Sequence, residues 1–232
     1  MLTKRPSQER GHANHGWLDT RHSFSFADYY DPRHRGFRVL RVLNEDVIAP
    51  NTGFGEHGHR DAEIISWVLH GSLAHRDSLG SGGVLRPGVA QVMTAGSGIR
   101  HSEMNPSAHE PGHFLQIWLS PRRSGGTPTY DQRDFPPAWR RDRLCPIASG
   151  DGREGSLIIQ QDAEIYAARL TAGRMLEHPL APGRHAWIQV AAGTLTVNQL
   201  TLTAGDGLAV SAESALTLTA TADSEFLLLE LP

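Results

Sequence analysis

The chain has 232 residues and a mass of 25.4 kDa, and 39% of its residues are hydrophobic, which is enough for one large β domain or two smaller ones. Its formal net charge is −3 and its only basic run is short, at 140–143, so we expect no direct nucleic-acid binding. One cysteine, Cys145, cannot form an intrachain disulfide, and apolar runs such as 226–229 are too short to cross a bilayer. These features predict a cytoplasmic protein without a secretion signal.

The N-terminal half is patterned as short strands rather than helices. Four segments are apolar or alternating and rich in β-branched and aromatic residues. They are 39–43, 64–69, 90–93 and 114–119. Glycine and proline separate them at close intervals, as at Gly71, Pro87 and Gly96. This spacing is typical of a β-sandwich or a closed β-barrel.

The character of the chain changes between Pro121 and about Gly155, where proline, glycine, arginine and aspartate dominate. Strand patterning resumes after this stretch and continues to residue 231. We therefore predict an N-terminal domain over 1–125, a connecting segment over 126–155 and a C-terminal domain over 156–232. Cys145 has no evident partner base, so we interpret it as an incidental thiol.

Two short strings carry metal-binding side chains two positions apart, His57-Gly58-His59 and His101-Ser102-Glu103. On a β-strand, residues i and i+2 point to the same face, so each string would direct both side chains into one cavity. Because the chain has thirteen histidines, the alternative is a solvated strand edge, but a glycine-rich turn before each string favours a site. Three imidazoles and a carboxylate suit a first-row divalent metal with positions open for substrate. The predicted ligands are His57, His59, His101 and Glu103.

The second half repeats the pattern of the first. Segment 67–73 matches 188–195 in residue type when Gly71 is aligned with Gly193. With such glycine-based offsets, the four ligand positions fall on Pro179, Ala181, Leu218 and Ala220. All four residues are apolar, although His178 lies close by, so we predict one metal ion per chain, bound in the N-terminal module.

The glycine-flanked histidine string and the later segment 98–105 resemble the two motifs of the cupin superfamily. More narrowly, four segments match the pattern of the pirin-like bicupins, and the resemblance spans nearly the whole chain. These segments are 10–18, 22–32, 75–78 and 98–103. The chain is most similar to bacterial members assigned quercetin 2,3-dioxygenase activity. This resemblance implies an all-β bicupin fold, with two double-stranded β-helix (jelly-roll) barrels packed face to face.

The resemblance also decides between two candidate carboxylates. A typical cupin places its ligand glutamate at a position that Ile64 occupies here, and the neighbouring Glu63 has the wrong strand parity to face the barrel interior. In pirin-like proteins the carboxylate follows the third histidine by two residues, which is Glu103 here. Glu63 is then expected at the surface or behind the ligands.

The activity that the resemblance implies is cleavage of a flavonol such as quercetin by O2, with release of carbon monoxide. The expected metal is Fe2+, although the ligand set tolerates Cu2+, Ni2+, Mn2+ or Zn2+. Glu103 is expected to accept the flavonol hydroxyl proton as well as to bind the metal. The alternative, from resemblance to eukaryotic pirins, is a non-enzymatic regulator whose metal site tunes binding to a protein partner.

The remaining histidines and aromatic residues receive structural interpretations. We expect His12, His15 and His22 to cap the barrel or to hydrogen-bond the turn. His75, with Asp77 and Ser78, is expected in a strand-to-turn feature, and the alternative for it is a position behind the ligands as their partner. None of these histidines is placed in the metal set. A cluster of aromatic residues is expected to pack over the barrel end, where it could border a flat substrate. Its members are Phe24, Phe26, Tyr29 and Tyr30.

Overall fold

The computed structural model describes all 232 residues, which divide into two compact units. The N-terminal unit comprises Gly11–Asp134 and Leu157–Gln161, and the C-terminal unit comprises the remaining segments, Met1–Arg10, Phe135–Ser156 and Asp162–Pro232. Almost all regular structure is β-strand, in agreement with the predicted all-β fold. The exceptions are helix α1 (Pro137–Arg140) and two 3-10 turns, η1 (Ser7–Glu9) and η2 (Arg153–Gly155). None of the helices has the length and hydropathy needed to span a membrane.

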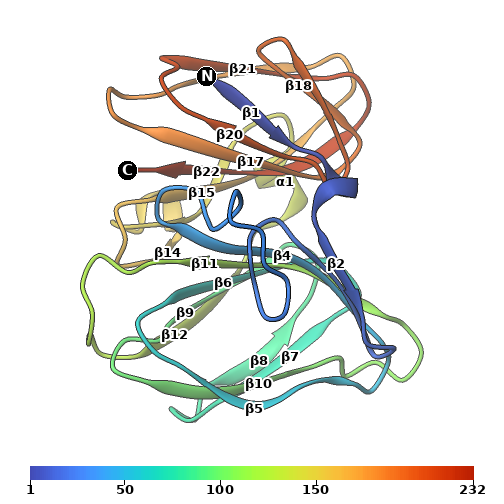
Figure 1. Ribbon diagram of the computed structural model, residues 1–232, viewed down its shortest axis with the longest axis vertical. Coiled ribbons are helices and arrows are strands. Elements are labelled where there is room, and N and C mark those ends of the chain that lie inside the picture. Colours follow the sequence, from blue (N-terminus) through green and yellow to red (C-terminus); the bar gives the residue numbers. More distant parts are fainter. The chain divides into compact units, whose positions relative to one another are not determined.

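Two antiparallel sheets form the N-terminal unit (Figure 1). The larger sheet contains, in spatial order, β12 (Thr129–Asp134), β9 (Val89–Thr94), β6 (Glu63–His70), β11 (Gly112–Leu119), β4 (Leu40–Ile48), β3 (Leu18–His22) and β2 (Gly11–Asn14). The smaller sheet, at the bottom of Figure 1, contains β5 (Gly53–His59), β10 (Ile99–Met104), β7 (Leu73–Asp77) and β8 (Gly82–Leu85). The short strand β14 (Leu157–Ile158) also belongs to this unit. The two sheets face each other and enclose the interior in which the predicted site lies.

The C-terminal unit repeats this arrangement. Its larger sheet contains β1 (Leu2–Arg5), β20 (Gly207–Val210), β17 (His185–Ala192), β22 (Ser224–Leu231), β15 (Glu164–Leu170) and β13 (Cys145–Ser149). Its smaller sheet contains β16 (Met175–Pro179), β21 (Ala215–Ala220), β18 (Thr194–Val197) and β19 (Leu200–Thr203). The order β9-β6-β11-β4 in the first unit corresponds to β20-β17-β22-β15 in the second, so the internal repeat seen in the sequence is also a repeat of topology.

The interiors of the two units differ in polarity. The C-terminal unit is filled by a continuous cluster of leucine, isoleucine, valine, alanine and phenylalanine side chains, among them Leu218 and Phe226. The N-terminal unit has two smaller apolar clusters, and many of its other buried side chains are polar. The buried polar residues of its larger sheet include Asn44, Asp46, Ser66, Gln91 and Gln116. Buried polar groups require partners, so this interior is built for hydrogen bonding rather than for packing alone.

The units differ from the predicted domain boundaries in two places. The predicted connecting segment 126–155 is ordered as strands: β12 extends the larger N-terminal sheet beside β9, and β13 belongs to the C-terminal sheet. Residues 1–10, predicted in the N-terminal domain, belong to the C-terminal unit because β1 pairs antiparallel with β20. Edge strands such as β1 and β12 are half exposed, so their sequences lack the apolar runs that revealed the central strands.

Candidate metal centre

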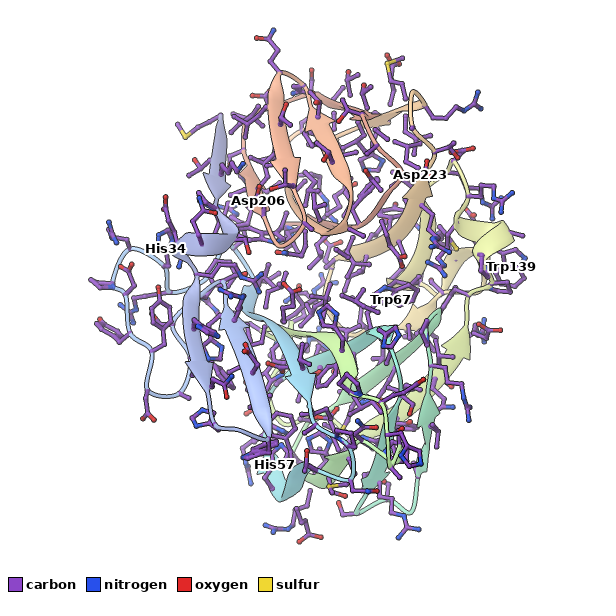
Figure 2. All side chains as sticks on the ribbon, turned by 90° about the vertical axis from the view of Figure 1, so that its right-hand side faces the viewer. His34, His57, Trp67, Trp139, Asp206 and Asp223 are labelled. Atoms are coloured by element: carbon purple, nitrogen blue, oxygen red, sulfur yellow. The ribbon has the colours of Figure 1, made fainter.

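Three histidine rings meet where strands β5 and β10 pair. His101 lies opposite His57 in the antiparallel register, and the ring of His59 is one pleat away on the same face. The ring centroids are 4.5 Å apart for His57 and His101, 4.7 Å for His57 and His59, and 4.8 Å for His59 and His101. Figure 2 labels His57 at the end of the N-terminal unit where these rings converge.

The atoms that meet are suited to a divalent ion. The Nε2 atoms of His59 and His101 are 2.9 Å apart, and two nitrogens each about 2.1 Å from a metal at a right angle would be about 3.0 Å apart. The Nδ1 of His57 lies 2.8 Å from the carbonyl of Gly55, which can only accept, so that ring keeps its Nε2 lone pair free. Burial, with neighbouring rings, lowers the pKa of His59 to about 4 and that of His101 to about 2. Neutral rings with free lone pairs are what metal binding requires.

Glu103 reaches the same interior from β10. The pairing of β10 with β5 shifts by one residue between His101 and Glu103, which is a β-bulge. The Gln116 amide donates to Glu103 Oε2 at 2.9 Å, and the Ser66 hydroxyl lies 3.3 Å from Oε1. Burial raises the pKa of Glu103 to about 7, against the opposing effect of the Gln116 hydrogen bond. An adjacent divalent cation would favour the ionised carboxylate.

The structure arranges the predicted ligands as two overlapping groups. The ligand atoms of His57, His59 and His101 lie within 4.8 Å of one another, and so do those of His75, His101 and Glu103. The three predicted histidines are therefore together, and Glu103 is beside His101 in the second group. His75 lies on β7, which ends at Asp77 and leads into a turn whose backbone N–H groups, from Leu79 and Ser81, donate to Asp77, as the expected strand-to-turn feature requires. Its side chain is also buried, opposite Glu103.

A cavity of about 320 Å³ opens beside the first group and gives it access to small molecules. Aromatic and polar side chains line it on different sides. The aromatic residues and histidines are His15, His22, Phe26, Phe54, His57, His59 and Trp118, and the polar or acidic ones are Thr20, Asn44, Asp46, Glu103 and Gln116. His75 and His101 do not line this cavity, and Glu103 is the member of the second group that does.

The members of the N-terminal aromatic cluster differ in their positions. Phe26 lines the cavity and meets Trp118 edge to face at 5.5 Å, and Tyr29 stacks on the cavity-lining His22 at 6.2 Å. Phe24 is buried but does not line the cavity, and Tyr30 is 68% exposed. The sequence-based prediction missed Gln116 and Trp118, although a polar glutamine within the apolar run 114–119 was a usable signal.

Comparison with known proteins agrees with this geometry. Residues 3–119 match the model of the family described as Pirin, and residues 146–231 match that of the quercetinase C-terminal cupin domain. The chain belongs to the pirin family. It is 47% identical to quercetin 2,3-dioxygenase of Escherichia coli, over 100% of this chain and 99% of that protein. A Pseudomonas aeruginosa relative, 48% identical over 231 residues and 99% of each chain, carries the same name as a provisional assignment.

The solved structure of one relative contains a bound metal ion. The crystal structure of a bacterial pirin from Escherichia coli in complex with nickel(II) is 46% identical, covers 100% of this chain and 99% of that one, and has a TM-score of 0.96. The predicted bicupin family and the two cupin domains are thus confirmed.

In the C-terminal cupin of this pirin, the positions aligned with the ligands carry no comparable group. Leu218 and Ala220 are buried in the apolar core. His178, on β16, bonds Glu230 at 2.9 Å, and Glu230 also accepts from Arg184 at 2.8 Å. Both groups of potential metal-binding side chains lie in the N-terminal unit.

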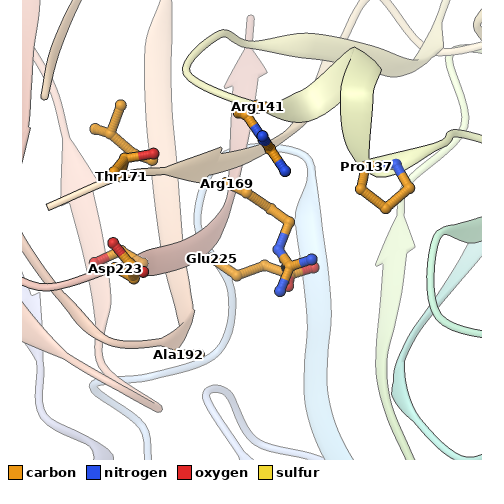
Figure 3. Close-up of a pocket in the computed structure, with 9 residues that line it drawn as sticks. Pro137, Arg141, Arg169, Thr171, Ala192, Asp223 and Glu225 are labelled. Atoms are coloured by element: carbon orange, nitrogen blue, oxygen red, sulfur yellow. Dashed lines mark ion pairs between the residues drawn. The ribbon is translucent and has the colours of Figure 1, made fainter.

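The C-terminal cupin also has a pocket, of about 380 Å³ (Figure 3). Its lining contains no histidine or cysteine. Arg169 pairs with Glu225 at 3.3 Å, and the buried Arg140 pairs with the same carboxylate at 3.0 Å. Figure 3 shows Arg141 and Pro137 at its border. The Glu225 carboxylate is thus taken up by two arginines, and the pocket offers no metal-binding nitrogen or sulfur, so we place the candidate site in the N-terminal cavity.

Gly53 supports the site through its lack of a side chain. A Cβ at this position would overlap the Glu103 carbonyl oxygen and lie 2.6 Å from the Met104 Cα. We expect Gly53→Ala to displace β10 at Glu103, to cost about 1–3 kcal/mol of stability, and to weaken metal binding. Thermal unfolding and metal titration would measure both effects. Gly55→Ala is the matched control on the same strand, since nothing lies within 4 Å of its Cβ; equal behaviour of the two variants would contradict the expectation.

Glu63 is not at the surface, which is where one of the two sequence-based expectations placed it. It is the first residue of β6 and has no exposed surface. Its Oε2 accepts from the Thr94 hydroxyl at 3.0 Å and from the backbone N–H of Gln160 at 3.0 Å. No hydrogen bond joins the Glu63 side chain to the histidine group. The parity argument that turned it away from the ligands agrees with these partners, one of which, Gln160, comes from the segment 157–161 of the same unit.

Burial raises the pKa of Glu63, against the two hydrogen bonds that oppose the shift. An acid whose pKa is raised by folding contributes stability below its unfolded pKa and loses it as pH rises through the folded pKa. We therefore expect Glu63→Gln to gain stability relative to the parent protein as pH rises from 5 to 8. Thermal midpoints of both proteins across this range, with the exposed Glu110→Gln as control, test it. A constant difference would count against the expectation.

Proposed function

We propose that this pirin is a metal-dependent dioxygenase that cleaves the heterocyclic ring of flavonols such as quercetin, using O2 and releasing carbon monoxide. The observation that carries the proposal is the convergence of three buried or half-buried histidines at a cavity with both aromatic and polar walls. The full-length similarity to quercetin 2,3-dioxygenase of Escherichia coli supports the substrate class.

One divalent ion would be held by His57, His59, His101 and Glu103, with Fe2+ as the first candidate. When bound, such an ion would act as a Lewis acid toward an enolate-type oxygen and leave coordination positions open. The ligand geometry supports the fit: two Nε2 atoms stand at the spacing of adjacent ligands, and the third ring is oriented by the Gly55 carbonyl. The nickel complex of the Escherichia coli relative supports metal binding by this fold.

The walls of the cavity would orient a flat polyphenol. Phe26 and Trp118 meet edge to face at 5.5 Å, and Phe54 meets Trp17 in the same way at 5.2 Å. These rings offer apolar surface for a planar ligand. On the polar side, the Thr20 hydroxyl donates to Asp46, and this carboxylate lines the cavity, where it could accept a hydrogen bond from a phenolic hydroxyl.

Glu103 is the residue to which we assign proton transfer. It lines the cavity, and Gln116 fixes its Oε2. A carboxylate held in this way at the cavity can accept the proton of the 3-hydroxyl as the flavonol binds. The buried amides and hydroxyl around it, Gln116, Ser66 and Gln91, keep the acceptor in place.

The test is a single-turnover reaction. The metal-free protein is loaded anaerobically with Fe2+ or Ni2+, mixed with quercetin, and then given oxygen. Loss of the flavonol absorbance together with carbon monoxide is expected, and metal-free protein should produce neither. Loaded protein that leaves quercetin intact would overturn the proposal and would favour the alternative, a metal-dependent regulator that binds a protein partner.

A further inference from the structure

A line of three buried side chains extends from the histidine group away from the cavity. His101 Nδ1 is 3.3 Å from His75 Nδ1, and His75 Nε2 is 3.2 Å from Asp77 Oδ2. The side chains of His75 and Asp77 have no exposed surface. All three belong to the paired strands β10 and β7. Neither His75 nor Asp77 is needed to hold a metal through the three-histidine group.

The direction of each hydrogen bond in this line follows from the Asp77 carboxylate, the last group in the line. Asp77 Oδ1 already accepts the backbone N–H groups of Leu79 and Ser81, both at 2.9 Å, so the carboxylate is fixed as an acceptor. His75 must therefore carry its proton on Nε2, which leaves Nδ1 as an acceptor. His101 must then carry its proton on Nδ1 and donate it to His75. The lone pair of His101 is left on Nε2, the atom that lies 2.9 Å from His59 Nε2.

We propose that His75 is a positioning residue that, together with Asp77, fixes the Nδ1–H tautomer of His101 and so presents its Nε2 lone pair to the metal. This inference rests on the metal-binding part of the proposed function, but not on the flavonol reaction. Partners of this kind set the orientation and basicity of a metal-bound imidazole.

Packing holds the His75 ring in the orientation that its hydrogen bonds with His101 and Asp77 require. The ring stacks on Tyr130 of β12, with centroids 4.5 Å apart and planes at 17°. The Tyr130 hydroxyl in turn donates to Gln132 at 2.7 Å. The other two ligands are held differently: His57 donates to the Gly55 carbonyl, and His59 meets Trp118 edge to face at 4.8 Å. Only His101 is held through a second histidine and a carboxylate.

The first experiment reads the tautomers directly in metal-free protein labelled with 15N-histidine. Two-bond 15N–1H correlation spectra should show His75 as the Nε2–H form and His101 as the Nδ1–H form, with assignments from the His75→Asn variant. In Asp77→Asn, the two backbone donors keep the amide oxygen on their side, so the amide nitrogen faces His75. Both tautomers should then invert. If the parent protein showed His75 as the Nδ1–H form and His101 as the Nε2–H form, or if neither tautomer changed in Asp77→Asn, the proposal would be overturned.

The second experiment measures Ni2+ affinity by competition with a chromophoric chelator. His75→Leu and Asp77→Asn should weaken binding by about 10- to 100-fold. His75→Asn should restore binding to within a few-fold of the parent, because its side-chain oxygen can accept from His101 where the ring nitrogen did. Asp19→Asn, at the partly exposed His12–Asp19 pair of the same unit, is the matched control and should leave affinity unchanged.

The outcomes separate the two proposals. Parent-like affinity in His75→Leu, or equal losses in His75→Leu and His75→Asn, would overturn the positioning role. Inverted tautomers and weakened Ni2+ binding in a protein that leaves quercetin intact would support the positioning role and refute the flavonol reaction alone.

Discussion

Replacing Glu103 with glutamine is expected to lower quercetin turnover by about 10²- to 10⁴-fold, the range typical of lost acid–base catalysis. The amide keeps the size of the side chain, and its oxygen can still accept from Gln116, so the fold should persist. It cannot take the hydroxyl proton, and it removes a negative charge from the metal site. Steady-state turnover, metal content and thermal unfolding of the purified variant would separate these effects.

Glu63→Gln is the matched control for this change. It replaces the other fully buried glutamate of the same unit, but that side chain is bonded to Thr94 and Gln160 rather than to the site. Its turnover and metal content at neutral pH should equal those of the parent. If the two variants behaved alike, or if Glu103→Gln retained full turnover with full metal occupancy, the roles assigned to Glu103 would have to be abandoned.

Adding Ni2+ to the metal-free protein, to a free concentration of about 100 to 1,000 times its Kd, should raise the thermal midpoint by about 5–15 °C. A ligand present at 100 to 1,000 times its Kd stabilises the folded state by about 2.7–4.1 kcal/mol, and a domain of about 200 residues responds by roughly 2–4 °C per kcal/mol. The gain should saturate at one ion per chain, because the interior of the C-terminal cupin is apolar where the N-terminal cupin carries its histidines. Calorimetry with elemental analysis checks both numbers.

The same titration on His101→Ala provides the control. Without the shared member of both histidine groups, the midpoint should no longer respond to Ni2+. Two tightly bound ions per chain in the parent protein, or an undiminished response in His101→Ala, would show that the ion binds elsewhere.

The convergence of His57, His59 and His101 could be predicted because it needs only strand periodicity. Each string of two residues alternates across a pleat, and antiparallel pairing of β5 with β10 does the rest. The absence of ligands in the second cupin followed from the same logic applied to a repeat. His75 was interpreted first as part of a strand-to-turn feature and only secondarily as a partner of the ligands, although His75-Arg76-Asp77 has the same i, i+2 spacing as the metal strings.

The edges of the fold could not be predicted, for physical reasons. The pattern of hydrophobic residues reports burial, and β12 is mostly exposed, so Tyr130 gave no sign that it would stack on His75. The position of β1 in the C-terminal sheet depends on backbone hydrogen bonds to β20, in a register that places Leu2 opposite Val210. Backbone pairing is nearly independent of side-chain identity, so sequence carries little information about it.

The placement of β1 has a consequence for how the protein is made. The strand β1 (Leu2–Arg5) leaves the ribosome ahead of β2–β22, but its partner β20 is synthesised about 200 residues later. Through most of translation, therefore, the N-terminal unit can complete its sheets while β1 remains an unpaired strand. The C-terminal sheet is therefore completed only when β20 pairs with β1, which was synthesised long before it. A fragment that started after residue 10 would leave β20 as an unpaired edge strand.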